Sequence, residues 1–120
     1  MHYIGIDIIE IAGIQRVIDH WGKRFLQRVY TEPELRLYHK QSSSLAARFA
    51  GKEAVMKALS APNWGITWKE IEILADPNGQ PIVHLYGKAQ NLANNLGLEL
   101  AISLSHSKEH AIAFVIGETR

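Results

Sequence analysis

Short apolar runs near both ends of the chain predict β-strands. Residues 3–9 are rich in isoleucine and contain Asp7, the pattern of a central strand with one inward polar residue. Residues 98–103 and 110–116 predict two further strands. A carboxylate among isoleucines is costly to bury, so we expect Asp7 to lie at a strand end, accept hydrogen bonds or bind a cation.

Helical spacing dominates the stretch that follows the first strand. Apolar residues at 14, 17, 18 and 21, then at 25, 26 and 29, predict a helix that is broken near Gly22. Thr31 and Glu34 form a capping-box pattern with a proline in the first turn, which predicts a helix over residues 35–39. This cap accounts for the presence of Glu34, so we expect no further role for it.

The segment RFAGKEAVMKAL, residues 48–59, predicts a partly buried helix that extends to about residue 60. The hydroxyls of Ser42–Ser44 are expected to cap its start. Glu53 and Lys57 are four residues apart and project from one face. Alone, such a pair is usually a surface ion pair that contributes about 0.2–0.5 kcal/mol. A functional interpretation therefore needs a second element elsewhere.

Turn signals organise the second half of the chain. Residues 66–75 and 81–85 flank Asp76–Gly79 and predict a hairpin, and residues 88–96 predict a helix ended by glycine. Residues 104–109 are expected to connect the last two strands and to offer hydrogen-bond donors to an anion. The order of elements predicts a single α+β domain over residues 1–120.

Composition narrows the classes of function. With 120 residues, 47% of them hydrophobic and 21% charged, the chain suits a globular protein. The absence of cysteine excludes disulfides and thiolate zinc sites and suits a reducing cytoplasm. Acids within the first apolar stretch disfavour a signal peptide or membrane span, so we expect a cytoplasmic protein.

The net charge of +1 hides an asymmetry along the chain. Residues 11–48 hold seven Lys or Arg against three Asp or Glu, whereas residues 49–120 hold six against seven. This basic excess suits an acidic partner. Basic and aromatic residues are not interleaved, so nucleic acid is not favoured.

The charged residues that stand out fit phosphoryl transfer. Asp7 and Glu53 are the only acids in strongly apolar or core-like helical surroundings, and magnesium is typically held by one or two carboxylates with substrate phosphates and water. Lys57, Arg48 and the Ser105–Ser107 segment add charge clamps and donors.

Other sites fit the sequence less well. A zinc pair at His106 and His110 would need one helix, but their surroundings predict strands. The serines lack a G-x-S-x-G setting and no glycine-rich phosphate loop occurs, which disfavours a serine hydrolase and a P-loop enzyme.

Four segments together carry a family resemblance over nearly the whole length: GIDIIEI, RFAGKEAVMKAL, WKEIEIL before PNGQP, and SLSHSKEHAIAFVI. The chain resembles the holo-acyl-carrier-protein synthases, the small trimeric members of the 4′-phosphopantetheinyl transferase superfamily. The resemblance implies an α+β fold with a mainly antiparallel sheet packed on helices. It also implies transfer of 4′-phosphopantetheine from coenzyme A to a serine of apo acyl carrier protein, releasing 3′,5′-ADP, in fatty acid biosynthesis.

The resemblance also implies residue roles. Asp7 and Glu53 match the magnesium ligands, and Lys57 matches a lysine near the phosphates. The positions expected to contact coenzyme A are Arg48, Lys57, Ser105 and His106. Arg24 and Arg28 match basic positions that bind the carrier protein. Family members form homotrimers with interface active sites, so the ligands of one coenzyme A are expected to come from two subunits.

The chain departs from the family pattern at several positions. Gly13 replaces a usual carrier-binding arginine, and Arg16, one helical turn further on, is the candidate substitute. Ser60–Asn63 differs from the family's nucleotide-contacting segment. The proton acceptor for the carrier serine is either Glu53, directly or through water, or His106.

Two other functional hypotheses remain open on the sequence. One is a non-catalytic module that binds coenzyme A or the carrier protein. The other is a transferase that acts on a peptidyl or polyketide carrier.

Overall fold

The structure, a computed structural model, describes residues 3–59 and 65–120. Its elements in chain order are β1 (Tyr3–Glu10), α1 (Ile11–Trp21), α2 (Lys23–Val29), α3 (Glu32–Tyr38), α4 (Ser42–Ala58), the 3₁₀ turn η1 (Trp68–Glu70), β2 (Ile71–Ala75), β3 (Pro81–Leu85), α5 (Gly87–Leu96), β4 (Leu98–His106) and β5 (His110–Thr119). The predicted α+β class is confirmed.

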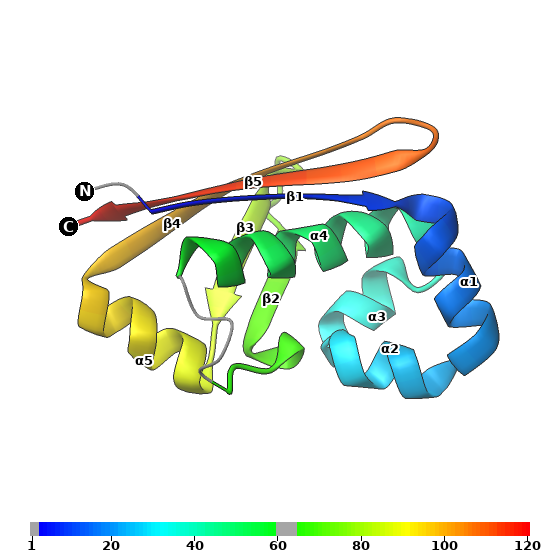
Figure 1. Ribbon diagram of the computed structural model, residues 1–120, viewed down its shortest axis with the longest axis horizontal. Coiled ribbons are helices and arrows are strands. Elements are labelled where there is room, and N and C mark those ends of the chain that lie inside the picture. The colour runs from blue at the N-terminus through cyan, green and yellow to red at the C-terminus, as the bar shows by residue number, and fades with distance from the viewer. Residues whose placement is uncertain (1–2, 60–64) are drawn as a thin grey trace.

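Three strands form one antiparallel sheet in the order β1-β5-β4, and β2 and β3 form a separate two-stranded antiparallel sheet. Figure 1 shows α4 running beneath the larger sheet, with α1–α3 at one end and α5 at the other. In the register of this sheet, Asp7 lies opposite Ala113 on β5, which in turn lies opposite Leu104 on β4. The sheet order, which the sequence left undetermined, makes β5 the central strand and β1 an edge strand. The prediction that residues 3–9 form a central strand is therefore wrong, because an isoleucine-rich run does not by itself give the position of a strand in its sheet.

Small residues bring α4 close to β1. Ala50, Ala54 and Ala58 are buried in the core beneath the sheet. A Cβ added to Gly5 would lie 2.8 Å from the carbonyl carbon of Ala54 and 2.9 Å from the amide nitrogen of Ala58. Only a glycine permits this approach of strand to helix backbone.

The helices at one end form largely as the sequence predicts. The helix break occurs at Gly22, which adopts φ 55°. Thr31 and Glu34 make both hydrogen bonds of the capping box. The predicted serine cap of α4 is wrong: Ser42–Ser44 form the first turn itself, Gln41 is the capping residue, and no side-chain cap forms.

The strands differ from prediction in their limits. The hairpin of β2 and β3 forms, but its first strand begins only at Ile71, because residues 68–70 turn as η1 behind the Thr67–Glu70 capping box. Residues 104–106 belong to β4, so the expected connection shortens to residues 107–109. The side chains of residues 104–109 therefore lie partly at the end of β4 and partly in a tight turn.

The remaining expectations fall partly outside the described residues. Gly97 ends α5 with φ 66°, as predicted. The altered Ser60–Asn63 segment lies among residues that the structure does not describe. Within the described ranges, no helix combines the length and the apolar character needed to cross a membrane.

Candidate functional site

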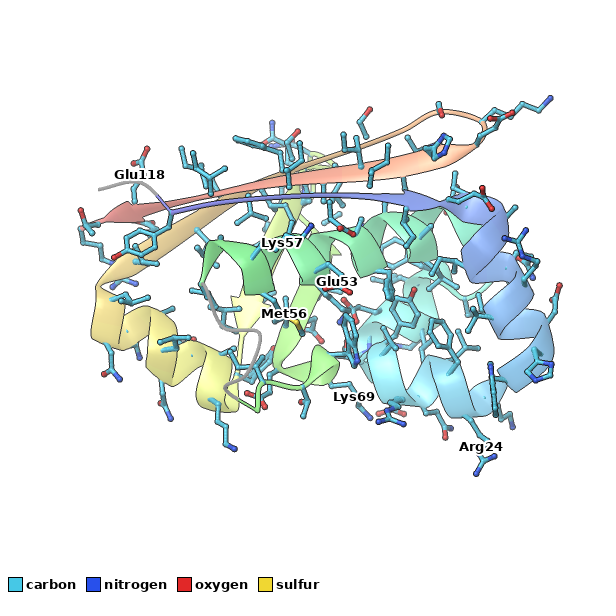
Figure 2. The ribbon with its side chains drawn as sticks, viewed as in Figure 1. Arg24, Glu53, Met56, Lys57, Lys69 and Glu118 are labelled. Carbon is cyan, nitrogen blue, oxygen red and sulfur yellow. The ribbon has the colours of Figure 1, made fainter. Side chains whose placement is uncertain are left out.

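The packing of β1 on α4 gathers three of the predicted site residues. Lys57 donates from Nζ to Asp7 Oδ1 at 3.0 Å and to the carbonyl oxygen of Ile6 at 2.9 Å. Figure 2 shows Lys57 on the side of α4 that faces β1 and Met56 on the opposite side. Asp7 therefore accepts a hydrogen bond, one of the three roles expected for it.

Glu53 lies close enough to Asp7 for their charges to interact. Partial burial raises the pKa of the Glu53 carboxyl above its ordinary value, the Asp7 carboxylate raises this pKa further, and the Lys57 ammonium lowers it. Two like charges at one site disfavour simultaneous ionisation, and a nearby cation relieves that repulsion.

The partner of Lys57 decides between two interpretations of the Glu53–Lys57 spacing. Lys57 forms its ion pair with Asp7, at 3.0 Å, and the hydrogen bonds in the described part of the chain include none between Lys57 and Glu53. The interpretation as an isolated surface pair on one helix is therefore wrong. Both side chains instead belong to a cluster with the strand residue.

The donor set of this cluster suits a hard divalent cation. Among the described residues there is no group of three or more His, Asp or Glu side chains arranged to hold a metal. Magnesium typically needs only one or two carboxylates when substrate phosphates and water complete its coordination. The paired carboxylates of Asp7 and Glu53 fit that requirement.

Arg48 lies on another side of α4. Its side chain is 9% exposed, its guanidinium carbon stands 3.8 Å from the ring centroid of Tyr38, and its Nε donates to the carbonyl oxygen of Ile73 at 3.3 Å. The structure thus places Arg48 against α3 and β2, and not beside Asp7. Its position is fixed by cation–π stacking and one backbone contact.

Ser105 and His106 lie at the exposed end of β4. Ser105 lies opposite Ile112, whose side chain is exposed on the outer face of the sheet, whereas the neighbouring pair of Leu104 and Ala113 faces α4. Since strand side chains alternate between faces, Ser105 projects away from the face that carries Asp7. One chain does not bring Ser105 to the Asp7 cluster.

Arg24 and Arg28 share one groove of about 420 Å³, lined also by Val17, Trp21 and Phe25. Trp21 is 52% exposed, so the groove presents an accessible aromatic ring together with two guanidinium groups. Figure 2 shows Arg24 on α2, pointing away from α4.

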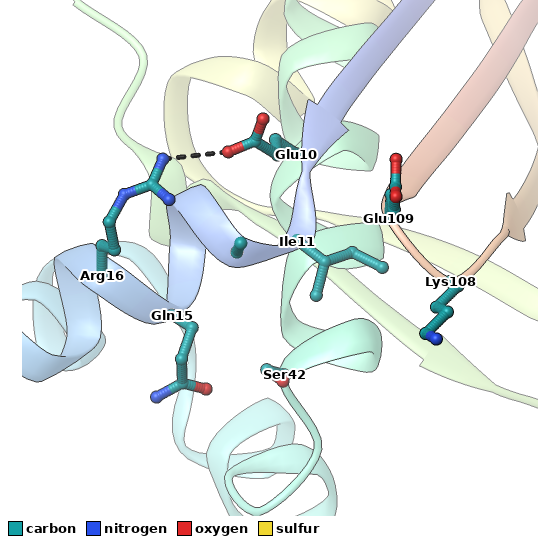
Figure 3. Close-up of a pocket in the computed structure, with 8 residues that line it drawn as sticks. Glu10, Ile11, Gln15, Arg16, Ser42, Lys108 and Glu109 are labelled. Atoms are coloured by element: carbon teal, nitrogen blue, oxygen red, sulfur yellow. Dashed lines mark hydrogen bonds and ion pairs between the residues drawn. The ribbon is translucent and has the colours of Figure 1, made fainter.

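Arg16 lies in a different setting from the other two arginines. It lines a cavity of about 770 Å³ between the start of α1, the start of α4 and the turn before β5, and its Nη2 forms an ion pair with Glu10 Oε1 at 2.9 Å (Figure 3). The same cavity is bordered by Lys108 and Glu109. The structure therefore does not group Arg16 with Arg24 and Arg28.

Sequence reasoning missed a buried ion pair between α3 and α4. Glu34 and Lys52 both have fully buried side chains, and Lys52 Nζ lies 2.7 Å from Glu34 Oε1. Their further backbone partners are the carbonyls of Trp68 and Ile71, which accept from Lys52, and the amides of Thr31 and Ile73, which donate to Glu34.

The expectations that the cap alone explains Glu34, and that Asp7 and Glu53 are the only acids in core-like surroundings, are therefore wrong. Glu34 is more deeply buried than either. The available signal was Lys52 itself, a lysine between Gly51 and Glu53 in a helix otherwise rich in alanine.

The sequence of the chain matches the 4′-phosphopantetheinyl transferase superfamily over residues 3–115. It is 51% identical to the holo-[acyl-carrier-protein] synthase of Dehalococcoides mccartyi, covering 98% of this chain and 99% of that protein. It is 45% identical to the synthase of Herpetosiphon aurantiacus, covering 94% and 95%.

The fold agrees with the sequence match. The crystal structure of the Helicobacter pylori holo-[acyl-carrier-protein] synthase in complex with coenzyme A aligns with a TM-score of 0.86 at 33% identity, covering 96% of this chain and 99% of that one. The resemblance found in the sequence motifs is thereby confirmed. The chain belongs to the holo-[acyl-carrier-protein] synthases of the 4′-phosphopantetheinyl transferase superfamily.

Proposed function

We propose that the protein transfers 4′-phosphopantetheine from coenzyme A to a serine hydroxyl of an apo acyl carrier protein and releases 3′,5′-ADP. The observation that carries the proposal is the cluster of Asp7, Glu53 and Lys57 where β1 packs on α4. Family membership supports it, because a relative has this activity in its name and another was crystallised with coenzyme A.

Magnesium dependence is part of the proposal. Asp7 and Glu53 would hold the ion, which supplies neutralising charge at the pyrophosphate when bound. Lys57 contributes a positive charge from the same cluster, where it offsets negative charge that develops on the leaving 3′,5′-ADP.

The chain's own groups account for the proton of the reaction. The serine oxygen forms a bond to the phosphorus that carries pantetheine, and the bond from that phosphorus to 3′,5′-ADP breaks. The serine proton passes to the Glu53 carboxylate, directly or through one water. A carboxylate within hydrogen-bonding reach of the hydroxyl can act as this general base.

We further propose a homotrimer in which two subunits share each coenzyme A. The outer face of the large sheet carries large apolar side chains that are 36–61% exposed in the single chain: Ile4, Ile6, Ile8, Ile112 and Phe114. Such a patch is typical of a surface that another copy covers. Ser105 lies on this outer face, Arg48 lies on the far side of α4, and His106, which is paired with the buried Ala111, follows Ser105 at the exposed end of β4. We propose that a neighbouring subunit's Ser105, His106 and Arg48 complete the site that Asp7 and Glu53 begin.

Arg24 and Arg28 would orient the carrier protein through the groove that they share with Trp21 and Phe25, and Arg16 would contact it from its separate cavity. Charges at such a rim mainly raise the association rate and set orientation. We propose a cytoplasmic reaction, one domain over residues 1–120, and a fatty-acid carrier protein as the acceptor.

The direct test incubates the purified protein with coenzyme A, Mg²⁺ and apo acyl carrier protein and measures the intact mass of the carrier. We expect the mass of phosphopantetheine to be added, and Glu53→Gln to lower kcat by about 100-fold or more, as expected for loss of a metal ligand or general base. Glu118→Gln, which removes an exposed carboxylate of β5, is the matched control and should leave kcat unchanged.

Two other outcomes separate the alternatives. Binding of coenzyme A or carrier without any mass change would indicate a non-catalytic module. If Glu53→Gln kept full activity and His106→Gln lost it, the general base would be His106 and not Glu53.

A further inference from the structure

The buried ion pair of Glu34 and Lys52 has no part in the proposed transfer, yet it lies directly beside the site. Lys52 precedes Glu53 on α4, and both members of the pair are fully buried. The pair and its backbone partners join α3, α4, η1 and the first residues of β2 in one hydrogen-bonded cluster. Every buried polar side-chain atom in the described residues has a partner.

The position of Lys52 determines which way Glu53 faces. Successive residues of a helix are about 100° apart around its axis, because a turn takes about 3.6 residues. When Lys52 is held against α3 and β2, Glu53 is directed away from that side. Its carboxyl then lies within the electrostatic influence of Asp7 on β1.

The opposite side of α4 is fixed by a different contact. There the backbone of β1 at Gly5 lies against the backbone of α4 at Ala54 and Ala58. Gly5 and the Lys52 cluster therefore hold α4 from two sides. The first contact sets the distance between helix and strand, and the second sets the rotation of the helix about its axis.

Stability alone is a weak explanation for this pair. Removing two charges from water costs free energy that their attraction often fails to recover, and apolar replacements of buried ion pairs are often as stable. A hydrogen-bonded ammonium, unlike an apolar side chain, is directional, so it admits one rotation of α4 and disfavours others. Lys52 donates to three acceptors from three elements, and each bond restricts that rotation.

We propose that Glu34 and Lys52 are positioning residues that fix the rotation of α4 and hold the Glu53 carboxyl beside Asp7 for cation binding and proton transfer. This inference rests on the proposed function, since the position of Glu53 matters only if the cluster is used. It assigns neither residue a contact with coenzyme A or with the carrier protein.

The test separates position from stability with the double variant Glu34→Gln/Lys52→Met, which removes both charges and leaves neither one buried alone. Leu45→Ala, an apolar core substitution near the start of α4, is the control for lost stability. Each protein is compared for thermal unfolding midpoint, kcat, KM for the carrier protein, and affinity for Mn²⁺ measured by electron paramagnetic resonance in the presence of coenzyme A.

We expect the folded double variant to lose about 10- to 100-fold in kcat and to bind Mn²⁺ more weakly, because small misplacements of a reacting group have effects of this order. KM for the carrier protein should not change, since its proposed surface lies on α1 and α2. The control should keep kcat and Mn²⁺ affinity even if its midpoint falls further. If the double variant does not fold, Glu34→Asp, which keeps both charges but shortens one arm, should fold and show a smaller loss of the same two quantities.

Normal kcat and Mn²⁺ affinity in a folded variant would overturn the inference and leave the proposed function intact. An equal loss in Leu45→Ala would also overturn it, because the effect would then follow stability. Absence of transfer by the unaltered protein would refute the proposed function, and this inference with it.

Discussion

Gly5 offers the sharpest test of how the site is assembled. It lies two residues before Asp7 on β1, and its α-carbon packs directly on the backbone of α4. In Gly5→Ala the new Cβ would stand 2.8 Å from the carbonyl carbon of Ala54 and 2.9 Å from the amide nitrogen of Ala58. The obstructing atoms are helix backbone, so no side chain can rotate to make room.

The size of the effect follows from these distances. Carbon atoms pack best at about 3.5–4.0 Å, so the contact with the Ala54 carbon alone requires strand and helix to separate by about 0.7 Å. The carbonyl oxygen of Ala54 would be closer still to the new Cβ, so the required separation is larger. Overpacking of a core typically costs about 1–3 kcal/mol, and occasionally more. Because the clash is with backbone, we expect the upper end, about 3 kcal/mol, from a total stability on the order of 5–15 kcal/mol.

Urea unfolding followed by circular dichroism measures this loss. With a slope of about 1–3 kcal/mol per molar urea, the midpoint of Gly5→Ala should fall by about 1–3 M. The matched control is Gly13→Ala, where a new Cβ meets nothing nearer than 3.7 Å. Since Gly13 lies inside α1, alanine should instead stabilise by about 0.5–1 kcal/mol.

Activity supplies a second measurement on the same two variants. Separation of β1 from α4 should displace Asp7 from Glu53 and lower kcat in Gly5→Ala, whereas Gly13→Ala should keep its kcat. An unchanged urea midpoint in Gly5→Ala would refute the assigned packing, and with it the explanation of how the two carboxylates meet.

Three further predictions concern the electrostatics and the helices. Burial and the Asp7 carboxylate raise the pKa of Glu53 above 4.5. Protonated Glu53 therefore stabilises the folded state below pH 4.5, and this stabilisation is lost as the pH rises through the raised pKa. Asp7→Asn should lower the pKa of Glu53, as measured by carboxyl ¹³C NMR. Thr31→Ala should remove the cap of α3 and cost about 1 kcal/mol in thermal unfolding. Arg24→Ala combined with Arg28→Ala should slow association with the carrier protein and weaken its salt dependence in stopped-flow measurements, with kcat unchanged.

Local signals in the sequence were sufficient for most elements. The isoleucine-rich run predicts β1, the Thr31–Glu34 cap predicts α3, and the Asp76–Gly79 turn predicts the hairpin, because each depends on interactions between residues close in the chain. The exceptions have local causes of their own. Residues 68–70 turn as η1 because a second capping box overrides the alternation, and β4 continues through His106 because pairing with β5 extends it.

The candidate site, like the fold, is predicted only in part by the sequence. Helical spacing alone places Glu53 and Lys57 on neighbouring positions of one face, and the isoleucines around Asp7 already make that carboxylate a candidate before the family resemblance is considered. The spacing does not reveal that Lys57 pairs with a residue 50 positions away, nor that Glu34 pairs with one 18 positions away. The sequence does not predict the burial of Glu34, because its local cap with Thr31 already accounts for the residue and indicates no second partner.

The sequence by itself determined most of the elements, several of their caps and turns, the family, and which residues carry charge. The tertiary structure alone decided which of those residues meet: it joins Asp7 to Lys57 and Glu53, turns Ser105 to the outer face, and seats Arg48 on Tyr38. The physical reason is range. Periodicity and capping act within a few residues, whereas the order β1-β5-β4 and the rotation of α4 depend on close packing and buried hydrogen bonds between distant segments.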